Sequence, residues 1–130
     1  MKNTFILFLF LLLNACTNQA PGTQGKLSMV EKDQKWVLVD EQNTVLYDVF
    51  IYDNGPDAAA DGLYRIVKDG KIGYADAATN AIVIEPQYDC AYPFENGKAK
   101  VSTNCKTVKD GEYDIWESDD WQFIDKKGGK

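Results

Sequence analysis

A short motif recurs three times along this chain, and it constrains the fold more than any other feature. Residues 35–40 (KWVLVD), 71–76 (KIGYAD) and 121–125 (WQFID) each place a large apolar residue ahead of smaller or apolar ones and an aspartate. A short polar segment typical of a turn follows each copy. Such self-similarity predicts a repeated architecture, in which neighbouring units complete one another's core.

Between the copies, runs of β-branched and aromatic residues alternate with turn signals. Residues 63–68 (LYRIVK) alternate apolar and polar as a half-buried strand does, and Asp69-Gly70 predicts a type I′ turn into residues 71–76. Asp110-Gly111 predicts a second hairpin of the same kind, and Asn96-Gly97 marks a further turn. The predicted fold class is all-β, with antiparallel hairpins formed from degenerate repeats.

Two residues near the central copy carry expectations about the backbone. Gly73 has no side chain and predicts a bulge or a close backbone approach. Pro86 follows the apolar run 82–84 and is expected to end that strand, because its nitrogen cannot donate to a ladder.

The central region as a whole resembles one unit of the WG repeat, a family also known for a Lys-Trp-Gly motif. The resemblance rests on KIGYAD at 71–76, IVIEPQYD at 82–89 and AYPFENGKAKV at 91–101. Ile72 stands where the family has tryptophan, and no copy in this chain keeps an intact Trp-Gly pair. The resemblance implies a β-rich scaffold for interaction, in proteins that are often secreted or membrane-anchored, and it implies no particular activity.

The N-terminus resembles the leader of a bacterial lipoprotein. Residues 5–13 are an apolar run, too short for a membrane-spanning helix of about 20 residues but suited to the hydrophobic region of a signal peptide. Leu13-Asn14-Ala15-Cys16 then resembles a lipobox. We expect residues 1–15 to be a cleaved signal peptide and Cys16 to carry lipid; an ordinary secretory signal is the alternative.

Domain organisation and location follow from this leader. Residues 16–26 contain Pro21, Gly22 and Gly25 and are expected to form a flexible tether, followed by a β-rich domain at 27–130. The lipid would anchor the protein to a membrane of the bacterial cell envelope. By resemblance to the enterobacterial sorting rule, the lack of an aspartate after Cys16 suggests the outer membrane.

The charge balance narrows the range of partners. The chain has 14 basic and 20 acidic residues, a net charge of −6. Acidic proteins repel the phosphates of nucleic acids and anionic lipid headgroups, so we expect neither nucleic-acid binding nor electrostatic docking on lipid. A charged surface that keeps the protein soluble is the simplest explanation.

Cysteine usage leaves one pair to consider. If Cys16 carries lipid, Cys90 and Cys105 remain, in a compartment that permits disulfides. A bridge closing this loop would contribute roughly 3 kcal/mol in the chain-entropy model, and two free thiols are the alternative. No metal or cofactor is expected, because the chain lacks histidine and two thiols are too few for a typical zinc site.

No catalytic constellation stands out. The absence of histidine excludes Ser-His-Asp and Cys-His pairs, and no single carboxylate pair is distinguished among the many acidic residues. The oxygen-rich segment 53–57 (DNGPD) lacks the spacing of an EF-hand and is expected to be a solvated turn. We therefore expect a binding protein that is not an enzyme.

Aromatic residues are the best candidates for binding. Trp36, Tyr74 and Trp121 occupy motif positions and are expected in the core, whereas Trp116 lies in an acidic segment outside the motif and is expected to be exposed. The candidate binding residues are Trp116, Glu117, Asp119 and Asp120.

Three functions fit these observations. The first is a protein-binding or scaffold lipoprotein of the envelope, the second a glycan-binding module, and the third an inhibitor-like or immunity-like lipoprotein with an acidic face. Exposed rows of aromatic rings would favour glycans. A clustered acidic face on residues 110–120 would favour a basic protein partner.

Overall fold

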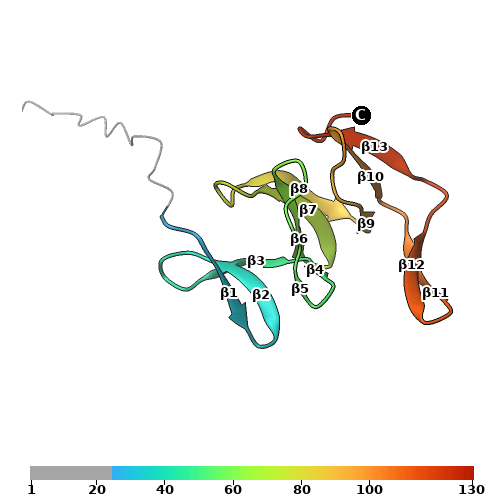
Figure 1. The fold of residues 1–130 in the computed structure, drawn as a ribbon. Helices are drawn as coiled ribbons and strands as arrows, with labels where there is room; N and C mark the ends of the chain where they lie inside the picture. The colour runs from blue at the N-terminus through green and yellow to red at the C-terminus, as the bar shows by residue number, and fades with distance from the viewer. Residues whose placement is uncertain (1–24) are drawn as a thin grey trace, which may run out of the picture.

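The computed structural model describes residues 25–130, which form an all-β fold of antiparallel strands (Figure 1). The predicted signal peptide, Cys16 and most of the expected tether lie outside the described residues. Within residues 25–130, no helix is long and apolar enough to cross a membrane. The strands are β1 (Ser28–Lys32), β2 (Lys35–Val39), β3 (Val45–Val49), β4 (Ile51–Tyr52), β5 (Gly55–Pro56), β6 (Leu63–Lys68), β7 (Lys71–Asp76), β8 (Ile82–Tyr88), β9 (Cys90–Ala91), β10 (Lys98–Ser102), β11 (Lys106–Asp110), β12 (Tyr113–Glu117) and β13 (Gln122–Asp125).

The strands form one large sheet and three small ones. The large sheet has six strands in the order β1-β2-β3-β6-β7-β8, and a second sheet has the order β13-β10-β9. Two further sheets, β4–β5 and β11–β12, are isolated hairpins. Figure 1 shows that the β11–β12 hairpin extends away from the other sheets. The predicted all-β class with antiparallel hairpins is therefore confirmed.

Two apolar cores lie on opposite faces of the large sheet. Successive residues of a strand point to opposite faces, and accordingly Leu63 belongs to one core while Tyr64 belongs to the other. The first core joins β6, β7 and β8 to the second sheet through Ala91, Val101 and Ile124. The second core packs β2 and β3 against β6 and β7. Strands β6 and β7 therefore hold the molecule together, since both of their faces are buried.

The three copies of the sequence motif end in similar turns, each capped by the motif aspartate; the turn after Asp76 is one residue longer than those after Asp40 and Asp125. In each, the carboxylate of the motif aspartate accepts hydrogen bonds from two backbone N–H groups two to four residues later. A residue with positive φ lies within each turn. The aspartates are Asp40, Asp76 and Asp125, and the positive-φ residues are Asn43, Asn80 and Gly128. The motif thus encodes a capped turn, which explains why its aspartate recurs.

The predicted hairpin turns are present, with one change of type. Asp69 and Gly70 have φ of 53° and 75°, and Asn96 and Gly97 have φ of 51° and 78°, as type I′ turns require. In the β11–β12 hairpin, Asp110 pairs with Tyr113, so the central residues are Gly111 and Glu112. Only the first of these two has positive φ, which is typical of a type II′ turn.

The expectation that Pro86 ends its strand is wrong, because β8 continues to Tyr88. Its pairing with β7 passes from Tyr74–Ile84 to Ile72–Tyr88, which leaves residues 85–87 as a bulge opposite Gly73. Proline is tolerated at a bulge of an edge strand, where its missing N–H breaks no ladder bond. The close approach predicted for Gly73 is confirmed, because a Cβ there would lie 2.6 Å from the nitrogen of Pro86.

Two units of the same design succeed one another along the chain. We call residues 35–68, from β2 to β6, the first repeat and residues 71–102, from β7 to β10, the second. The register of each first strand pair shifts at the same motif position, between Leu38 and Val39 and between Tyr74 and Ala75. The last strand of each repeat is preceded by an equivalent bridged turn, Ala60–Leu63 before β6 and Glu95–Lys98 before β10.

The two repeats differ in the segment that connects each of them to the next strand. Two residues, Asp69 and Gly70, join the first repeat to β7. The second repeat is joined to β13 by residues 103–121, which we call the insertion and which contain the β11–β12 hairpin. Insertions in repeat proteins tend to lie on one face, often the face that binds.

A candidate binding cleft between two hairpins

The base of the insertion is fastened to the second repeat. A disulfide joins Cys90 of β9 to Cys105, with their Cα atoms 5.9 Å apart. The hydroxyl groups of Ser102 and Ser118 share a hydrogen bond of 2.7 Å, and the Ser118 hydroxyl also lies 2.7 Å from the carbonyl oxygen of Asn104. These contacts fix the direction in which the hairpin leaves the body.

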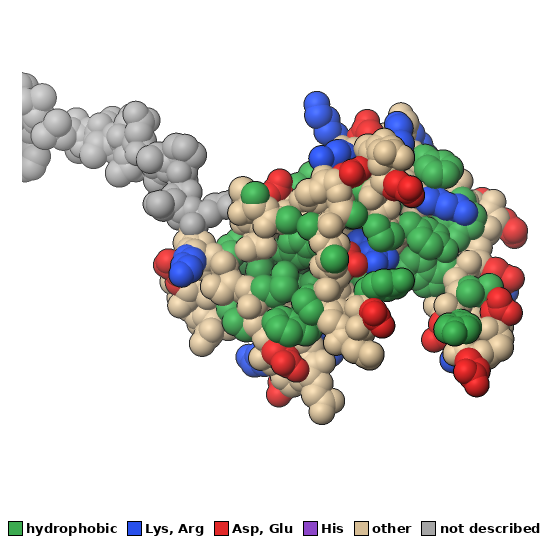
Figure 2. All heavy atoms as spheres, viewed as in Figure 1, with side chains coloured by type: hydrophobic (Ala, Val, Ile, Leu, Met, Phe, Trp, Pro, Cys, Tyr) green, Lys and Arg blue, Asp and Glu red, His purple; other side chains and the backbone are tan. Residues whose placement is uncertain are grey.

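The fastened hairpin and the β4–β5 hairpin of the first repeat enclose a cleft of about 860 Å³. Its lining includes Phe50, Tyr52 and Arg65 from the first repeat, and Asp114 and Trp116 from the insertion. Figure 2 shows hydrophobic side chains gathered on this side of the molecule and an open gap beside the projecting hairpin. The Tyr52 side chain is 69% exposed at the edge of the cleft, so its ring is available to a ligand.

A row of aromatic rings runs along the inner wall of the cleft. The ring centroid of Trp116 lies 6.0 Å from that of Phe50 and 5.2 Å from that of Tyr92, with edge-on geometry in both cases. Trp121 extends the row, 5.5 Å from Tyr92. Edge-to-face pairs of this kind stabilise packing beyond the area they bury, so the row holds the insertion against the repeats.

The row joins equivalent positions of the two repeats. The N–H of Phe50 donates to the carbonyl oxygen of Arg65, and the N–H of Tyr92 donates to that of Lys100. The cations at these positions also pair with rings, since the Arg65 guanidinium lies 4.1 Å from the Phe50 centroid and the Lys100 ammonium 5.9 Å from the Tyr92 centroid. Trp116 therefore inserts between two copies of one cation–aromatic pair.

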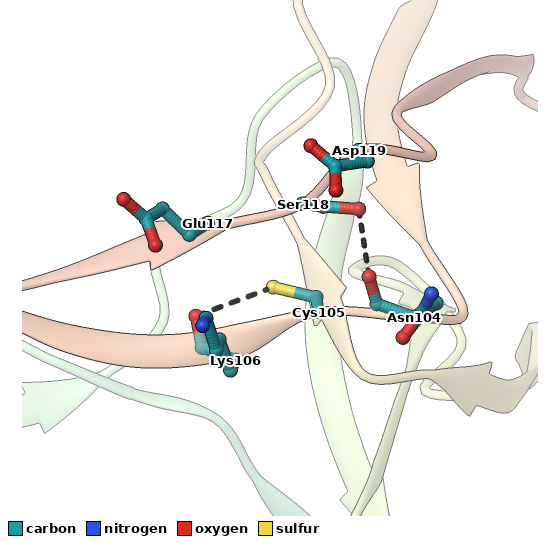
Figure 3. A pocket seen from close by; sticks show the side chains of 6 residues that line it. All are labelled: Asn104, Cys105, Lys106, Glu117, Ser118 and Asp119. Carbon is teal, nitrogen blue, oxygen red and sulfur yellow. Dashed lines mark hydrogen bonds between the residues drawn. The ribbon is translucent and has the colours of Figure 1, made fainter.

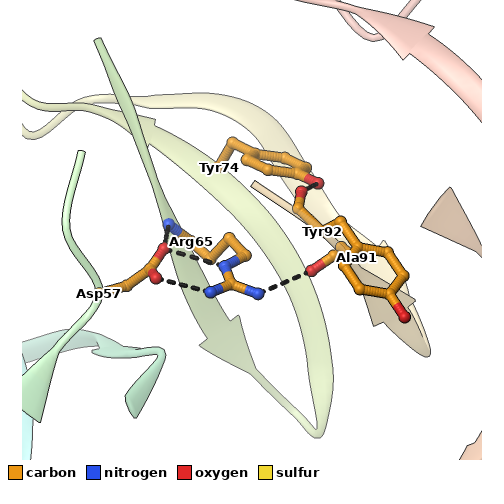
Figure 4. A network of polar contacts seen from close by, with 5 residues as sticks. All are labelled: Asp57, Arg65, Tyr74, Ala91 and Tyr92. Atoms are coloured by element: carbon orange, nitrogen blue, oxygen red, sulfur yellow. Dashed lines mark hydrogen bonds and ion pairs between the residues drawn. The ribbon is translucent and has the colours of Figure 1, made fainter. Parts of the chain in front are cut away.

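Arg65 forms the floor of the cleft and is only 4% exposed (Figure 4). Its guanidinium donates to both carboxylate oxygens of Asp57, at 2.9 and 2.6 Å, and to the carbonyl oxygen of Ala91 at 3.0 Å. The Asp57 carboxylate also accepts the backbone N–H of Arg65. A buried charge needs such partners, and these bonds commit Arg65 to the structure instead of to a ligand.

The backbone beside the cleft is held by Tyr74. Its hydroxyl donates to the carbonyl oxygen of Tyr92 at 2.7 Å (Figure 4). Burial raises the pKa of Tyr74 well above that of a free phenol, so the hydroxyl keeps its proton and remains a donor. The position of Tyr92 in the aromatic row thus depends on the core of the second repeat.

The structure separates the candidate binding residues. Trp116 lines the cleft, whereas Glu117 and Asp119 line a separate polar hollow of about 480 Å³ at the base of the insertion (Figure 3). The Asp120 carboxylate accepts a hydrogen bond of 3.0 Å from the side-chain amide of Asn104. Asp120 therefore contributes to fastening the insertion.

The expectations for the aromatic residues were right in part. Tyr74 is in the core, 1% exposed, whereas Trp36 and Trp121 are partly exposed. The prediction that Trp116 is exposed holds only in part, because this residue, like Trp36 and Trp121, is half-buried and packs against the first core. Its edge-on contacts with Phe50 and Tyr92 cover much of the ring.

The sequence did not single out Arg65, because it occupies a polar position of the expected half-buried strand 63–68. Phe50 and Tyr52 were not singled out either, because residues 45–52 are a run of β-branched and aromatic residues typical of one strand. In the structure the strand breaks at Phe50, and Asp53 and Asn54 form a positive-φ turn between β4 and β5. The Asp53-Asn54 pair, typical of a turn, was the sequence signal for this break.

The oxygen-rich segment 53–57 contains one carboxylate that is already bound, because the buried Asp57 carboxylate pairs with Arg65. Among the described residues, no group of three potential metal ligands occurs.

Together, the fold and the cleft define a β-repeat protein that carries a hairpin insertion. Residues 72–106, from β7 to the start of the insertion, match the family model of the WG containing repeat, so this stretch of the chain is a WG repeat. Comparison with curated proteins gave no match, and comparison with solved structures gave none either.

Proposed function

We propose that this protein is a lipid-anchored binding module of the bacterial cell envelope and that the cleft holds part of a protein partner. In this proposal the domain carries out no catalysis. The WG repeat supports the β-repeat scaffold, and the lipobox-like residues 13–16 support the anchor. In this proposal, residues 16–26 would act as a tether that keeps the cleft near the membrane surface.

The observation that carries the binding role is the cleft itself. Two hairpins that belong to no larger sheet enclose it, and Ile51, Tyr52 and Ile115 leave apolar surface exposed there, between 41% and 69% of each residue. Exposed apolar surface concentrated at one concave place indicates an interaction site. The rings around Trp116 meet edge to face instead of lying side by side as sugar platforms, which favours a protein partner over a glycan.

The anchor is tested by replacing Cys16 with serine in the full chain. A serine hydroxyl is not the thiol that lipobox processing modifies, so the variant should leave the membrane fraction while the parent chain stays in it. Quantitative blotting of fractionated cells measures this directly. If both chains stay in the membrane fraction, the proposed lipid anchor is wrong.

The cleft is tested by site-specific photocrosslinking in cells. A benzoylphenylalanine at Tyr52 should form a covalent adduct with a discrete protein, because its ring faces the cleft. The matched control is the same substitution at Phe123, which is 60% exposed and lies outside this cleft. Equal adducts from both positions, or none from Tyr52, would contradict a protein-binding cleft.

A further inference from the structure

We propose that the occupant of the cleft is an extended peptide segment bearing lysine or arginine, supplied by a basic partner protein. This inference rests on the proposed function and names the chemistry of the partner. It combines the charge around the cleft, the exposed rings and a free strand edge.

The charge around the cleft is negative. Its lining carries three carboxylates, those of Asp53, Asp57 and Asp114, and one cation, Arg65. Asp57 and Arg65 neutralise each other in a buried pair, which leaves Asp53 on one lip and Asp114 on the other. Asp114 also pairs with Lys109, but both side chains are largely exposed and such pairs are weak. A cation entering the cleft would therefore find a carboxylate on each lip.

The insertion adds to this field. Residues 103–121 contain six acidic residues and two lysines, a net charge of −4. Figure 2 shows acidic side chains gathered on the projecting hairpin. Fields of one sign attract partners of the opposite sign and speed their association.

Aromatic rings and carboxylates together recognise cationic side chains. The faces of tyrosine and tryptophan attract lysine and arginine, and the protein already uses this pairing in its own structure, with Arg65 on Phe50 and Lys100 on Trp121. Tyr52 and Trp116 both line the cleft, and Tyr52 is mostly exposed. The Arg65 guanidinium already lies 5.9 Å from the Tyr52 centroid. Because Tyr52 stays 69% exposed, a guest cation would meet the part of the ring that Arg65 leaves open.

The edge of β12 suits an extended chain. Three consecutive residues of β12, Asp114 to Trp116, line the cleft, and β12 pairs with β11 alone among the described strands. Its other edge therefore offers unpaired N–H and C=O groups, on which a peptide can add a strand. Backbone pairing would supply affinity and the charged lips would select basic side chains.

The test is direct binding of synthetic peptides of about eight residues, long enough for one strand, to the full chain purified in detergent. One peptide alternates lysine with threonine and one alternates glutamate with threonine, and a chitin oligosaccharide is the sugar probe. Calorimetry should show binding of the lysine peptide alone, weakened by added salt.

Charge variants then locate the binding. Asp53→Asn with Asp114→Asn should weaken lysine-peptide binding about tenfold, as the loss of two rim charges implies. The control is Glu31→Gln with Asp33→Asn, which removes the same charge from the β1–β2 hairpin, outside the cleft lining, and should change binding less than twofold. Asp33 and Asp53 both have positive φ, which asparagine tolerates, so the two variants are equally suited to fold.

The outcomes separate this inference from the proposed function. Three results would overturn the proposal that the cleft binds a lysine- or arginine-bearing segment. These are equal binding of the glutamate peptide, equal weakening by the control variant, and binding of the sugar alone. A Tyr52 crosslink to a protein would still support the binding cleft in each of these cases. A missing crosslink together with tight lysine-peptide binding would instead contradict the protein partner in cells, and it would still support the preference of the cleft for basic peptides.

Discussion

At the scale of single residues, Gly73 shows why the repeated motif needs a glycine in one copy and not in another. Gly73 faces the bulge of β8, where Ile84 and Pro86 approach so closely that any side chain would meet backbone. In the first repeat Val37 takes the place of the glycine, and there the strand pairs regularly with Asp48. The glycine is therefore needed where the bulge is present and dispensable where it is absent.

This contrast yields a prediction for Gly73→Ala. The new Cβ would lie 2.6 Å from the nitrogen of Pro86, and backbone cannot move aside as a flexible side chain can. We expect the free energy of unfolding to fall by about 3 kcal/mol. Urea denaturation measures it, with Gly55→Ala as control, because no atom lies within 4 Å of a Cβ at Gly55. Comparable losses in the two variants would contradict the role of the bulge.

At the scale of elements, turns were predictable and long-range contacts were not. Asp69-Gly70 and Asn96-Gly97 specify their backbone conformation locally, so the sequence sufficed for these hairpins. Trp116 stood out in the sequence, but nothing there indicated that its ring packs against Phe50 and Tyr92. Their meeting depends on how the insertion folds back over the first repeat, and no local pattern encodes that.

The disulfide allows the insertion to be tested as an element. Cys90→Ala with Cys105→Ala should reduce the free energy of unfolding by roughly 3 kcal/mol in the chain-entropy model. Amide exchange should rise more in β11 and β12 than in β6 and β7, because the bridge fastens the hairpin while the central strands are buried on both faces.

Reductant supplies the control for this experiment. The parent chain under reducing conditions should match the double variant, and the variant should not respond to reductant. Unchanged protection of β11 and β12 in the double variant would show that the serine hydrogen bonds and the aromatic row suffice to hold the insertion.

At the scale of the whole molecule, buried tyrosines in both cores make the stability of the fold sensitive to alkaline pH. Tyr47 and Tyr64 share a hydrogen bond in the second core, and Tyr74 and Tyr88 lie in the first. Burial is the main cause that raises the pKa of each of the four above that of a free phenol. Both cores therefore disfavour ionisation of the tyrosine hydroxyls that they bury.

The sign of the pH dependence is set by these raised pKa values. A group with a raised folded-state pKa stabilises the fold fully below its unfolded pKa, about 10 for tyrosine, and loses that contribution as pH rises through the folded pKa. We expect the free energy of unfolding to fall steadily above about pH 10. Tyrosinate absorbance should show the four buried phenols ionising only as the chain unfolds. Ionisation of all seven tyrosines with the fold intact would contradict this.

The junction after each repeat has a consequence for how such proteins diversify. A two-residue turn occupies this junction after β6, and a whole hairpin occupies it after β10, while the turns after Asp40, Asp76 and Asp125 all keep the aspartate cap. On the proposed function, exchange of the hairpin at this junction would change what the cleft binds without altering the two repeats. A foreign hairpin could be grafted at this junction, between Ser102 and Gln122, without redesign of the two repeats.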